Sequence, residues 1–396
     1  MRRANLAAVM RFVAGGGRVS RARIATATGL TRGTVSSLVA ELVERGLLRE
    51  TGVPTAVGRV GRPGLGLELG TNVVAVGLEP NVDYLAAVAE DLRGNVLHER
   101  RVYRENRLSS PEPVLDVLAD LAEEVIAACA GEGRTVIGVG VAVPGIVERD
   151  TQLLRRAPNL GWHDMRVADE IGARLSEDLP VVVENESNLA ALAEQRLGAA
   201  RAVDNFALAF GEVGVGGGIV VDGQLFRGAH GFGGELGHMT VVRDGQPCLC
   251  GARGCLERYA GVEAIAARAG VHAEGERTTS LAIELVRRAE AGDAAVLKSL
   301  VETGEHLGTA LASLVNLLDL DVVVLGGCFA VLFPWLAGPV SSALDQGMVA
   351  QQWTSCEVRQ SALGESAPVR GAAHLGLVRV LDAPWTVDAG PLVEAV

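Results

Sequence analysis

The sequence contains few aromatic residues, few cysteines and almost no lysine. Aromatic side chains make up 4% of the 396 residues, and Lys298 is the only lysine beside 35 arginines. Six cysteines are too few for a disulfide-based scaffold in a chain of this length. With 48% apolar and 21% charged residues, the composition excludes a disordered or collagen-like protein. The length instead predicts two or three globular domains.

The sequence also lacks an obvious membrane-spanning or secretory segment. The apolar stretch from Val322 to Gly338 is shorter than the ~20 residues that span a bilayer, and it contains Gly326, Gly327 and Pro334. The N-terminus begins like a signal peptide, but Arg11 interrupts its apolar run and no clear cleavage site follows. We therefore expect a cytoplasmic protein without a membrane partner.

Charge is distributed unevenly along the chain. The net charge is −12, yet residues 1–67 contain eleven arginines and three glutamates, a net charge of +8. Residues 68–396 therefore carry −20. A basic head on an acidic body indicates that the head contacts a polyanion and the body does not.

The basic head has the pattern of a helix-turn-helix. Apolar residues at helical spacing predict helices over about 4–14, 21–28 and 32–45. Ser20 and Thr31 are suitable N-caps for the second and third helices. The apolar face of the third helix leaves four residues outward at its start, where recognition residues meet base edges. These are Arg32, Thr34, Ser36 and Ser37.

A wing follows the three helices. Residues 47–50 and 65–69 are predicted strands around a glycine-rich loop at 58–64, in which Arg59 and Arg62 could enter a narrow minor groove. Two other interpretations remain open: a helical bundle with a solvated arginine face, and a winged helix that contacts protein. The capped helices, the wing and the charge together favour DNA binding.

The acidic body alternates strands and helices twice. The first series comprises strands at 73–78, 84–90, 95–102, 135–143 and 181–183, with helices at 114–130 and 188–197. The second comprises strands at 205–210, 217–222 and 322–325, with helices near 261–270, 278–291 and 293–318. Two similar α/β lobes are the simplest arrangement, and a small ligand would bind in the cleft between them.

A cluster of cysteines predicts a metal site. Cys248, Cys250 and Cys255 lie within eight positions, and His238 precedes them by ten residues. Three thiolates and one imidazole suit a closed, tetrahedral structural zinc site. The alternative is three free cysteines in a loop beside an ordinary histidine. Because no coordination position stays open, a zinc ion there would hold the loop without catalysing a reaction.

Four segments of the body carry a family resemblance. They are residues 157–162 (Ala-Pro-Asn-Leu-Gly-Trp), 184–188 (Glu-Asn-Glu-Ser-Asn), 233–238 (Gly-Gly-Glu-Leu-Gly-His) and the cysteine loop 248–255. Joined to the helix-turn-helix, they resemble the ROK family of repressors and sugar kinases over nearly the whole chain. The resemblance implies an α/β protein: a winged helix-turn-helix (1–67) followed by the two-lobed, actin-like and ribonuclease-H-like fold of the family's sugar kinases. The lobes would span 68–200 and 201–396, with a C-terminal helix returning toward the first.

The resemblance also implies which residues face a sugar in the cleft. They are Asn159, Asn185, Glu186, Glu235, His238 and Glu257. Side-chain amides and carboxylates can pair with the donors and acceptors of adjacent sugar hydroxyls. Without the family, Glu235 and Glu257 would be interpreted as solvated loop residues, as most single carboxylates are.

The nucleotide motifs of the family's kinases are altered in this chain. The kinases carry Asp-x-Gly-Gly-Thr after the first strand, whereas residues 79–84 contain no glycine, and Glu79 and Asp83 would repel phosphate. Their Gly-Thr-Gly-Ile-Gly loop here begins Glu212-Val213, although a tight strand turn would also explain its remaining glycines. Glu186 replaces the catalytic Asp, and a displacement near 1 Å can cost on the order of 100-fold in rate.

These departures predict a chain without kinase activity. Leu325-Gly326-Gly327 resembles the family's adenosine-side loop, which would favour a kinase. A strand that ends in a turn explains the same three residues equally well. We therefore expect a sugar-responsive transcriptional regulator that acts as a homodimer or homotetramer and represses carbohydrate-related genes. Its partners would be operator DNA and a sugar or sugar-phosphate effector. Two alternatives are an active ATP-dependent sugar kinase with an accessory DNA-binding head, and a ligand-independent DNA-binding protein whose body serves only oligomerisation.

Overall fold

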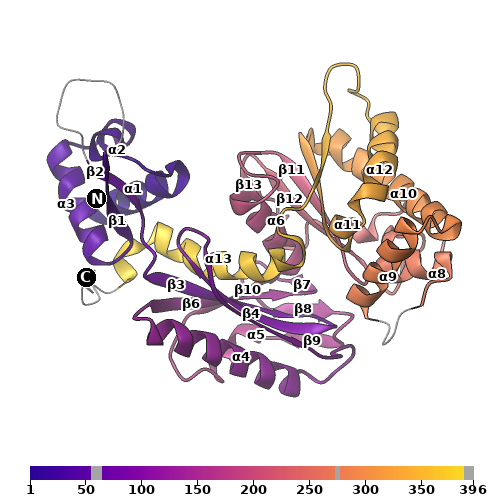
Figure 1. The fold of residues 1–396 in the computed structure, drawn as a ribbon, viewed down its shortest axis with the longest axis horizontal. Coiled ribbons are helices and arrows are strands. Elements are labelled where there is room, and N and C mark those ends of the chain that lie inside the picture. Colours follow the sequence, from indigo (N-terminus) through magenta and orange to yellow (C-terminus); the bar gives the residue numbers. More distant parts are fainter. Residues whose placement is uncertain (55–64, 273–276, 388–396) are drawn as a thin grey trace.

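The computed structural model describes residues 1–54, 65–272 and 277–387. Figure 1 shows a small helical head at one end and two α/β lobes beyond it. Among the described residues, none of the helices combines the length and the apolar character that crossing a bilayer requires. The predicted wing arginines, Arg59 and Arg62, lie outside the described residues.

The head consists of three helices and a two-stranded sheet. Its elements are α1 (Arg2–Gly16), α2 (Arg21–Thr28), α3 (Arg32–Glu44), β1 (Leu48–Pro54) and β2 (Leu65–Leu69). Ser20 Oγ accepts a hydrogen bond from Arg23 N at 3.3 Å, and Thr31 Oγ1 accepts one from Thr34 N at 3.2 Å. Both predicted N-caps are confirmed. The antiparallel pairing of β1 with β2 completes a winged helix-turn-helix.

The first lobe is built on a five-stranded sheet of order β10-β6-β3-β4-β5. Its strands are β3 (Val73–Pro80), β4 (Tyr84–Asp91), β5 (Val96–Tyr103), β6 (Thr135–Val143) and β10 (Val181–Asn185). The chain reverses between β3, β4 and β5, whereas β6 and β10 run parallel to β3. Helix α4 (Pro111–Gly131) covers one face, and α13 (Ala367–Asp382) covers the other (Figure 1).

A smaller sheet of three short strands extends the first lobe. It contains β7 (Ile146–Val147), β8 (Leu154–Ala157) and β9 (Trp162–Met165), followed by the short helix α5 (Val167–Gly172). Trp162 is buried, and its Nε1 donates to Ser109 O at 3.0 Å. The turn between β8 and β9 carries Asn159. The sequence did not predict this sheet, because strands of two to four residues show too little alternation.

The second lobe contains a sheet of order β13-β12-β11-β14-β15. Its strands are β11 (Phe206–Gly211), β12 (Val215–Val221), β13 (Gln224–Leu225), β14 (Val322–Gly327) and β15 (Glu357–Gln360). Helix α6 (Glu186–Leu197) packs between the two sheets. The helices of the second lobe are α7 (Glu257–Ala260), α8 (Val262–Ala269), α9 (Thr278–Glu290), α10 (Ala294–Leu318), α11 (Cys328–Val331) and α12 (Phe333–Gly347). Short 3-10 turns are η1 (Leu236–His238), η3 (Gly364–Ser366) and η4 (Pro384–Thr386).

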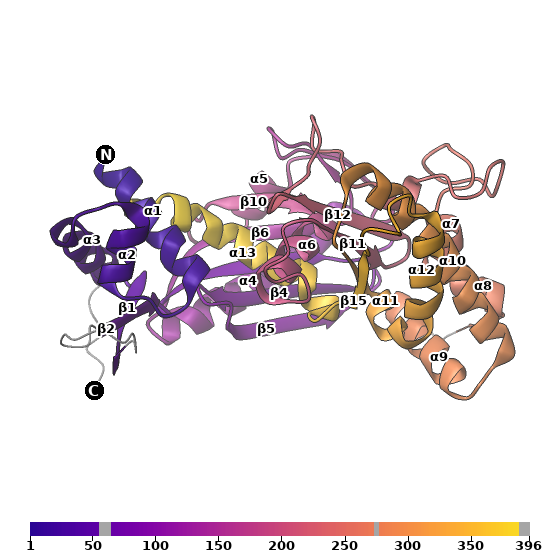
Figure 2. The ribbon, with the colours of Figure 1, turned by 90° about the horizontal axis from the view of Figure 1, so that it is seen from above.

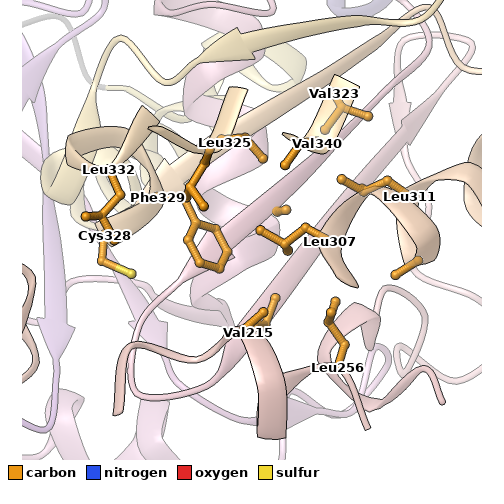
Figure 3. Close-up of a cluster of buried hydrophobic side chains, with 14 of the residues drawn as sticks. Val215, Leu256, Leu307, Leu311, Val323, Leu325, Cys328, Phe329, Leu332 and Val340 are labelled. Atoms are coloured by element: carbon orange, nitrogen blue, oxygen red, sulfur yellow. The ribbon is translucent and has the colours of Figure 1, made fainter. Parts of the chain in front are cut away.

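The core of the second lobe fixes two segments that border the ligand cavity described below. Figure 3 shows Leu307 and Leu311 of α10 packed among side chains of β14, α11 and α12. Val215 and Leu256 close the same cluster. Burial of Val215 and Leu256 restrains the positions of Gly214 and Glu257, which are their neighbours in the sequence and line the cavity.

The head shares its hydrophobic core with the first lobe. Leu377 and Val380 of α13 are buried in the same cluster as Leu6 and Val9 of α1. Figures 1 and 2 show α13, in yellow, extending from the head along the first lobe toward the second. An ion pair between Arg11 and Asp382 (2.8 Å) reinforces the contact at the end of the helix. Helix α13 is therefore a structural part of the head as well as of the body.

Candidate functional site: an acidic cavity beside a Cys/His cluster

A cavity of about 430 Å³ lies between segments of the two lobes. Residues 144–147 and the β8–β9 turn contribute to one side, and the residues around the β11–β12 turn and residues 233–238 contribute to the other. All six residues predicted to face a sugar line it: Asn159, Asn185, Glu186, Glu235, His238 and Glu257. The structure thus brings together side chains that are up to 98 positions apart in the sequence.

The first turn of α6 positions the central residues of the cavity. Asn185 is the N-cap, and its Oδ1 accepts hydrogen bonds from Ser187 N at 2.9 Å and Asn188 N at 3.0 Å. Its Nδ2 donates to Gly145 O at 2.9 Å. These bonds fix the amide of Asn185, so that this residue shapes the cavity wall in addition to facing its interior.

Asn188 also lines the cavity, and the sequence analysis did not select it. Its Nδ2 donates to Glu184 Oε1 at 3.1 Å, while its Oδ1 is buried and has no hydrogen-bond partner among the described residues. Glu184 is held in turn by an ion pair with Arg227 at 2.7 Å. The available signal was helical spacing, since Asn188 follows the capping Asn185 by three residues.

Three carboxyl groups lie close together at one side of the cavity: Glu79, Glu186 and Glu212. The charge of Glu79 raises the pKa of the other two. Tyr84 Oη donates to Glu79 Oε1 at 2.6 Å, and Asn81 Nδ2 donates to Glu212 Oε2 at 3.1 Å. Burial raises the pKa of Glu79 to about 7, and burial together with the charge of Glu79 raises the pKa of Glu212 to about 8. The pKa of Glu186 is raised well above its usual value by burial and by these two neighbours.

Both segments that differ from the kinase motifs are hairpin turns. Asn81 N donates to Tyr84 O at 2.9 Å between β3 and β4, and Glu212 N donates to Gly214 O at 3.0 Å between β11 and β12. The glycines after Glu212 are needed for close packing, because a Cβ atom at Gly216 would overlap Ser187 Oγ. The turn interpretation of these glycines therefore accounts for their positions.

His238, Cys248, Cys250 and Cys255 form a cluster whose ligand atoms all lie within 4.8 Å of one another. His238 Nδ1 lies 3.7 Å from Cys248 Sγ, and the sulfur atoms of Cys250 and Cys255 are 3.6 Å apart. Bonds of ~2.0–2.3 Å to a tetrahedral ion would separate neighbouring ligands by roughly 3.5–3.8 Å. The donor set and its spacing fit a bound metal ion.

The Cys/His cluster and the cavity share side chains. His238 Nε2 lies 3.8 Å from Glu235 Oε2, while His238 Nδ1 lies 3.7 Å from Glu257 Oε1. Glu257 Oε1 also accepts from Cys248 Sγ at 2.8 Å. A metal bound by the cluster would therefore fix the orientation of His238, and with it one wall of the cavity.

The start of α3 presents the predicted recognition residues to solvent. Arg32, Ser36 and Ser37 are exposed and Thr34 is partly buried, whereas the opposite face of the helix is buried. Six of the nine described arginines of the head form ion pairs. Three of these pairs use Glu68 or Asp382, which lie outside residues 1–67 and balance part of the positive charge of the head. Arg32 has no ion-pair partner among the described residues, which leaves its guanidinium free for an external anion.

The fold and the site define a class of protein: a winged helix-turn-helix joined to a two-lobed body that encloses a polar cavity is a DNA-binding regulator with a ligand-binding domain. The chain belongs to the ROK family, whose sequence profile matches residues 75–378. A MarR family profile matches residues 7–56. The two matches correspond to the body and to the head.

Similar proteins include both regulators and kinases. The xylose repressor of Bacillus subtilis strain 168 is 30% identical over 365 residues, which cover 92% of each chain. The crystal structure of a ROK family transcriptional regulator, a homologue of the E. coli MLC protein, has a TM-score of 0.80 at 26% identity and covers 97% of this chain and 98% of its own. A ROK family glucokinase from Streptomyces griseus, in complex with glucose and AMPPNP, has a TM-score of 0.66 at 28% identity and covers 76% of this chain and 98% of its own.

Proposed function

We propose that the protein is a sugar-responsive transcriptional repressor of carbohydrate-related genes. The observation that carries this proposal is the combination, in one chain, of a winged helix with an exposed recognition face and a cavity lined by amides and carboxylates. The similarity to a xylose repressor over 92% of both chains supports the same function. Xylose is accordingly the first sugar to test.

The start of α3 would enter the major groove of operator DNA. Arg32, Thr34, Ser36 and Ser37 would contact base edges and phosphates there, and Arg59 and Arg62 would reach the minor groove. A homodimer or homotetramer would present paired heads to two half-sites. We also retain 1–67, 68–200 and 201–396 as proposed domain boundaries, with α13 shared between them.

The sugar would bind in the cavity through the six predicted residues. Amide and carboxylate groups of Asn159, Asn185 and Glu186 would face hydroxyls from one lobe, and Glu235, His238 and Glu257 would face them from the other. A ligand held by both lobes has different affinities for different lobe arrangements. That difference is what allows it to shift a conformational equilibrium.

We propose a structural zinc ion at His238, Cys248, Cys250 and Cys255. Zinc would supply no reaction step, because four protein ligands complete its tetrahedral coordination. Its role would be to hold the loop from Cys248 to Cys255 against the cavity. His238 would then link the metal site to the sugar.

A route from the cavity to the head runs through α6 and α13. Helix α6 starts at the cavity with Glu186, and near its end Arg196 lies 3.2 Å from Glu90 Oε1 and 2.7 Å from His374 Nδ1 of α13. Arg370 of α13 binds the other oxygen of Glu90 at 2.9 Å. Because Glu90 is fully buried, these contacts resist independent movement of the two helices. A shift of α6 would be passed through α13 to the shared core of the head.

We propose that the chain does not phosphorylate sugars. By the family resemblance, Glu79, Asp83 and Glu212 would take the place of the kinases' phosphate-binding loops, and acidic side chains offer a nucleotide phosphate no positive charge. The competing function is an active kinase with a DNA-binding head. ATP consumption with xylose or glucose, lost in the Glu186→Ala variant, would support the kinase instead.

Operator binding provides the direct test of the proposed function. The DNA upstream of the gene, labelled with a fluorophore, should bind the purified full chain, and the complex should dissociate when one sugar of a panel is added. A scrambled duplex of equal length is the control. Equal affinity for both duplexes would contradict sequence-specific repression, and operator binding that no sugar changes would favour a ligand-independent DNA-binding protein.

A further inference from the structure

A second hollow, of about 690 Å³, adjoins the cavity. The two spaces share four lining residues: Asn159, Gly214, Leu249 and Glu257. Leu249 is 74% exposed, so its side chain is not packed into the space where they meet. Ligand pockets commonly enclose ~300–1,000 Å³, and the cavity of about 430 Å³ lies in that range without the hollow. A ligand confined to the cavity would therefore leave the hollow open.

The walls of the hollow come from both lobes. Arg107 and Asn159 belong to the first lobe, while helices α7, α8 and α10 supply most of the wall from the second. The ion pair between Arg107 and Glu263 joins the two sides. A ligand in the hollow would therefore contact both lobes, as a ligand in the cavity does.

The charges in the hollow are balanced. Among the described residues, its wall contains three arginines and three glutamates: Arg107, Arg258, Arg268, Glu257, Glu263 and Glu302. Arg107 pairs with Glu263, and Arg268 pairs with Glu302 at 3.2 Å. Arg268 Nε also donates to Ser299 Oγ at 3.1 Å, so its guanidinium is engaged in packing α8 against α10. Because paired charges offer an anion little net attraction, the hollow suits an uncharged polar ligand.

The remaining groups of the hollow are those that bind a sugar ring. Tyr259 and His306 form an aromatic pair with ring centroids 4.9 Å apart. Burial and the charge of Arg268 lower the pKa of His306, which keeps its ring uncharged at neutral pH. Arg258 is exposed and has no ion-pair partner within the described part of the chain, and Gln246 adds a side-chain amide. A sugar ring has an apolar face that can pack on an aromatic ring, and hydroxyls that can pair with amides and guanidinium groups.

From these contacts we propose that the hollow binds a second sugar unit, joined by a glycosidic bond to the unit in the cavity. The effector is then a disaccharide or a longer oligosaccharide. This inference rests on the proposed function and deepens it, because it assigns the hollow and extends the ligand beyond one sugar ring. Glu257 lines both spaces and would lie beside the linkage, where its carboxylate can accept from a hydroxyl of either unit.

The test compares monosaccharides with their own disaccharides on the full chain, in a buffer that contains zinc. Xylose with xylobiose, glucose with cellobiose and maltose, and N-acetylglucosamine with chitobiose are titrated calorimetrically. At least one disaccharide should bind about tenfold more tightly than its monosaccharide or better, because the contacts of the second unit add to those of the first.

Two results of these titrations would overturn the inference and leave a sugar-responsive repressor intact. One is a monosaccharide that binds at least as tightly as every disaccharide of the panel. The other is a phosphate ester, such as glucose 6-phosphate, that binds more tightly than every disaccharide, since the arginines of the hollow would then serve an anion. If no sugar of the panel binds or alters operator affinity, the proposed function itself fails.

Variants test whether the second unit lies in the hollow. Ala267 is exposed on α8 and lines the hollow but not the cavity. Ala267→Trp should therefore weaken disaccharide binding by about tenfold or more and leave monosaccharide binding unchanged. Arg258→Ala, which removes hydrogen-bond donors from the same wall, should act in the same direction. Ala127→Trp, at an exposed position of α4, is the control and should change neither affinity. Disaccharide binding that Ala267→Trp leaves unaltered, or an equal loss for both ligands, would contradict the placement of the second unit.

Discussion

Buried carboxylates are the residue-scale feature that sets this cavity apart. Glu79 is completely buried, and Tyr84, Asn81 and Glu212 surround it. Burial raises the pKa of Glu79 to about 7. Glu79 therefore titrates near neutral pH, and so does Glu212, whose pKa is raised to about 8. Stability should depend on pH because of them.

Stability should fall as the pH rises through neutrality. A carboxyl whose pKa is higher in the folded state binds its proton more tightly there, so its contribution is complete below pH 4.5 and is lost as the pH passes 7 to 8. The Glu79→Gln variant keeps the acceptor for Tyr84 and removes the ionisation. Between pH 5.5 and 8.5, wild type should lose on the order of 2 kcal/mol more unfolding free energy than the variant in urea titrations. Parallel pH profiles would contradict this assignment.

The cysteine cluster makes a second prediction at this scale. Purified protein should contain about one zinc ion per chain by elemental analysis, and Cys250→Ser should lose it, since a structural site needs all four ligands. Cys356→Ser changes a cysteine that is not part of the cluster and should retain the metal. Equal zinc content in both variants would place the ion elsewhere.

At the scale of elements, the long and strongly patterned segments could be predicted from the sequence. The expected helix at 21–28 and strands at 65–69 and 135–143 have the predicted boundaries. Helix α12 was not predicted, and the C-terminal helix α13 was expected from the family resemblance without bounds, since each contains glycine or proline that normally ends a helix. In α13, Gly371 allows the backbone of Leu189 to approach, a tertiary reason that local pattern cannot reveal.

The candidate site could be predicted only as separate motifs. The spacing of the cysteines indicated the metal cluster, and family resemblance indicated six cavity residues. Asn188, Glu212 and Arg156 were not assigned to the cavity, because their place in its wall depends on how distant strands and turns pack. Likewise, the charge of the head could be counted from the sequence, but the ion pairs of its arginines with Glu68 and Asp382 could not be predicted.

Helix α3 should provide sequence-specific affinity. Arg32→Ala removes an exposed guanidinium that forms no ion pair with the described residues, and operator affinity should fall by about tenfold, with a shallower dependence on salt if the contact is to phosphate. Arg201→Ala removes an exposed arginine of the body and should have no effect. Fluorescence anisotropy at several salt concentrations measures both properties. Unchanged affinity in Arg32→Ala would argue against the proposed docking of α3.

At the scale of the whole molecule, polar contacts bridge the two lobes near the cavity. Asn81 binds Glu212, and Asp83 Oδ2 accepts from Thr278 N at 2.6 Å. Arg107 pairs with Glu263, and Arg227 pairs with Glu184 at 2.7 Å. These bonds hold the two lobes together. Opening of the lobes must break them.

Loss of one bridge should therefore loosen the lobes. Asp83→Ala removes the acceptor of the Thr278 amide, so hydrogen exchange at the start of α9 should accelerate by about tenfold in mass spectrometry. Asp116→Ala, on the far side of α4, is the control and should leave this peptide unchanged. A sugar that binds both lobes should slow the exchange again. Equal protection of the peptide in Asp83→Ala and wild type would show that this bond does not restrain the lobes.

The shared core of head and first lobe has a consequence for protein engineering and for descent within the family. Because Leu377 and Val380 are buried against α1, a head transplanted from a relative would meet a surface shaped for a different partner. Functional chimaeras should thus require α13 to be exchanged together with the head. By the same reasoning, a lineage that lost its DNA-binding head would have to replace these two apolar side chains by polar ones. In a relative without a head, the residues at these two positions should therefore record whether an ancestor once bound DNA.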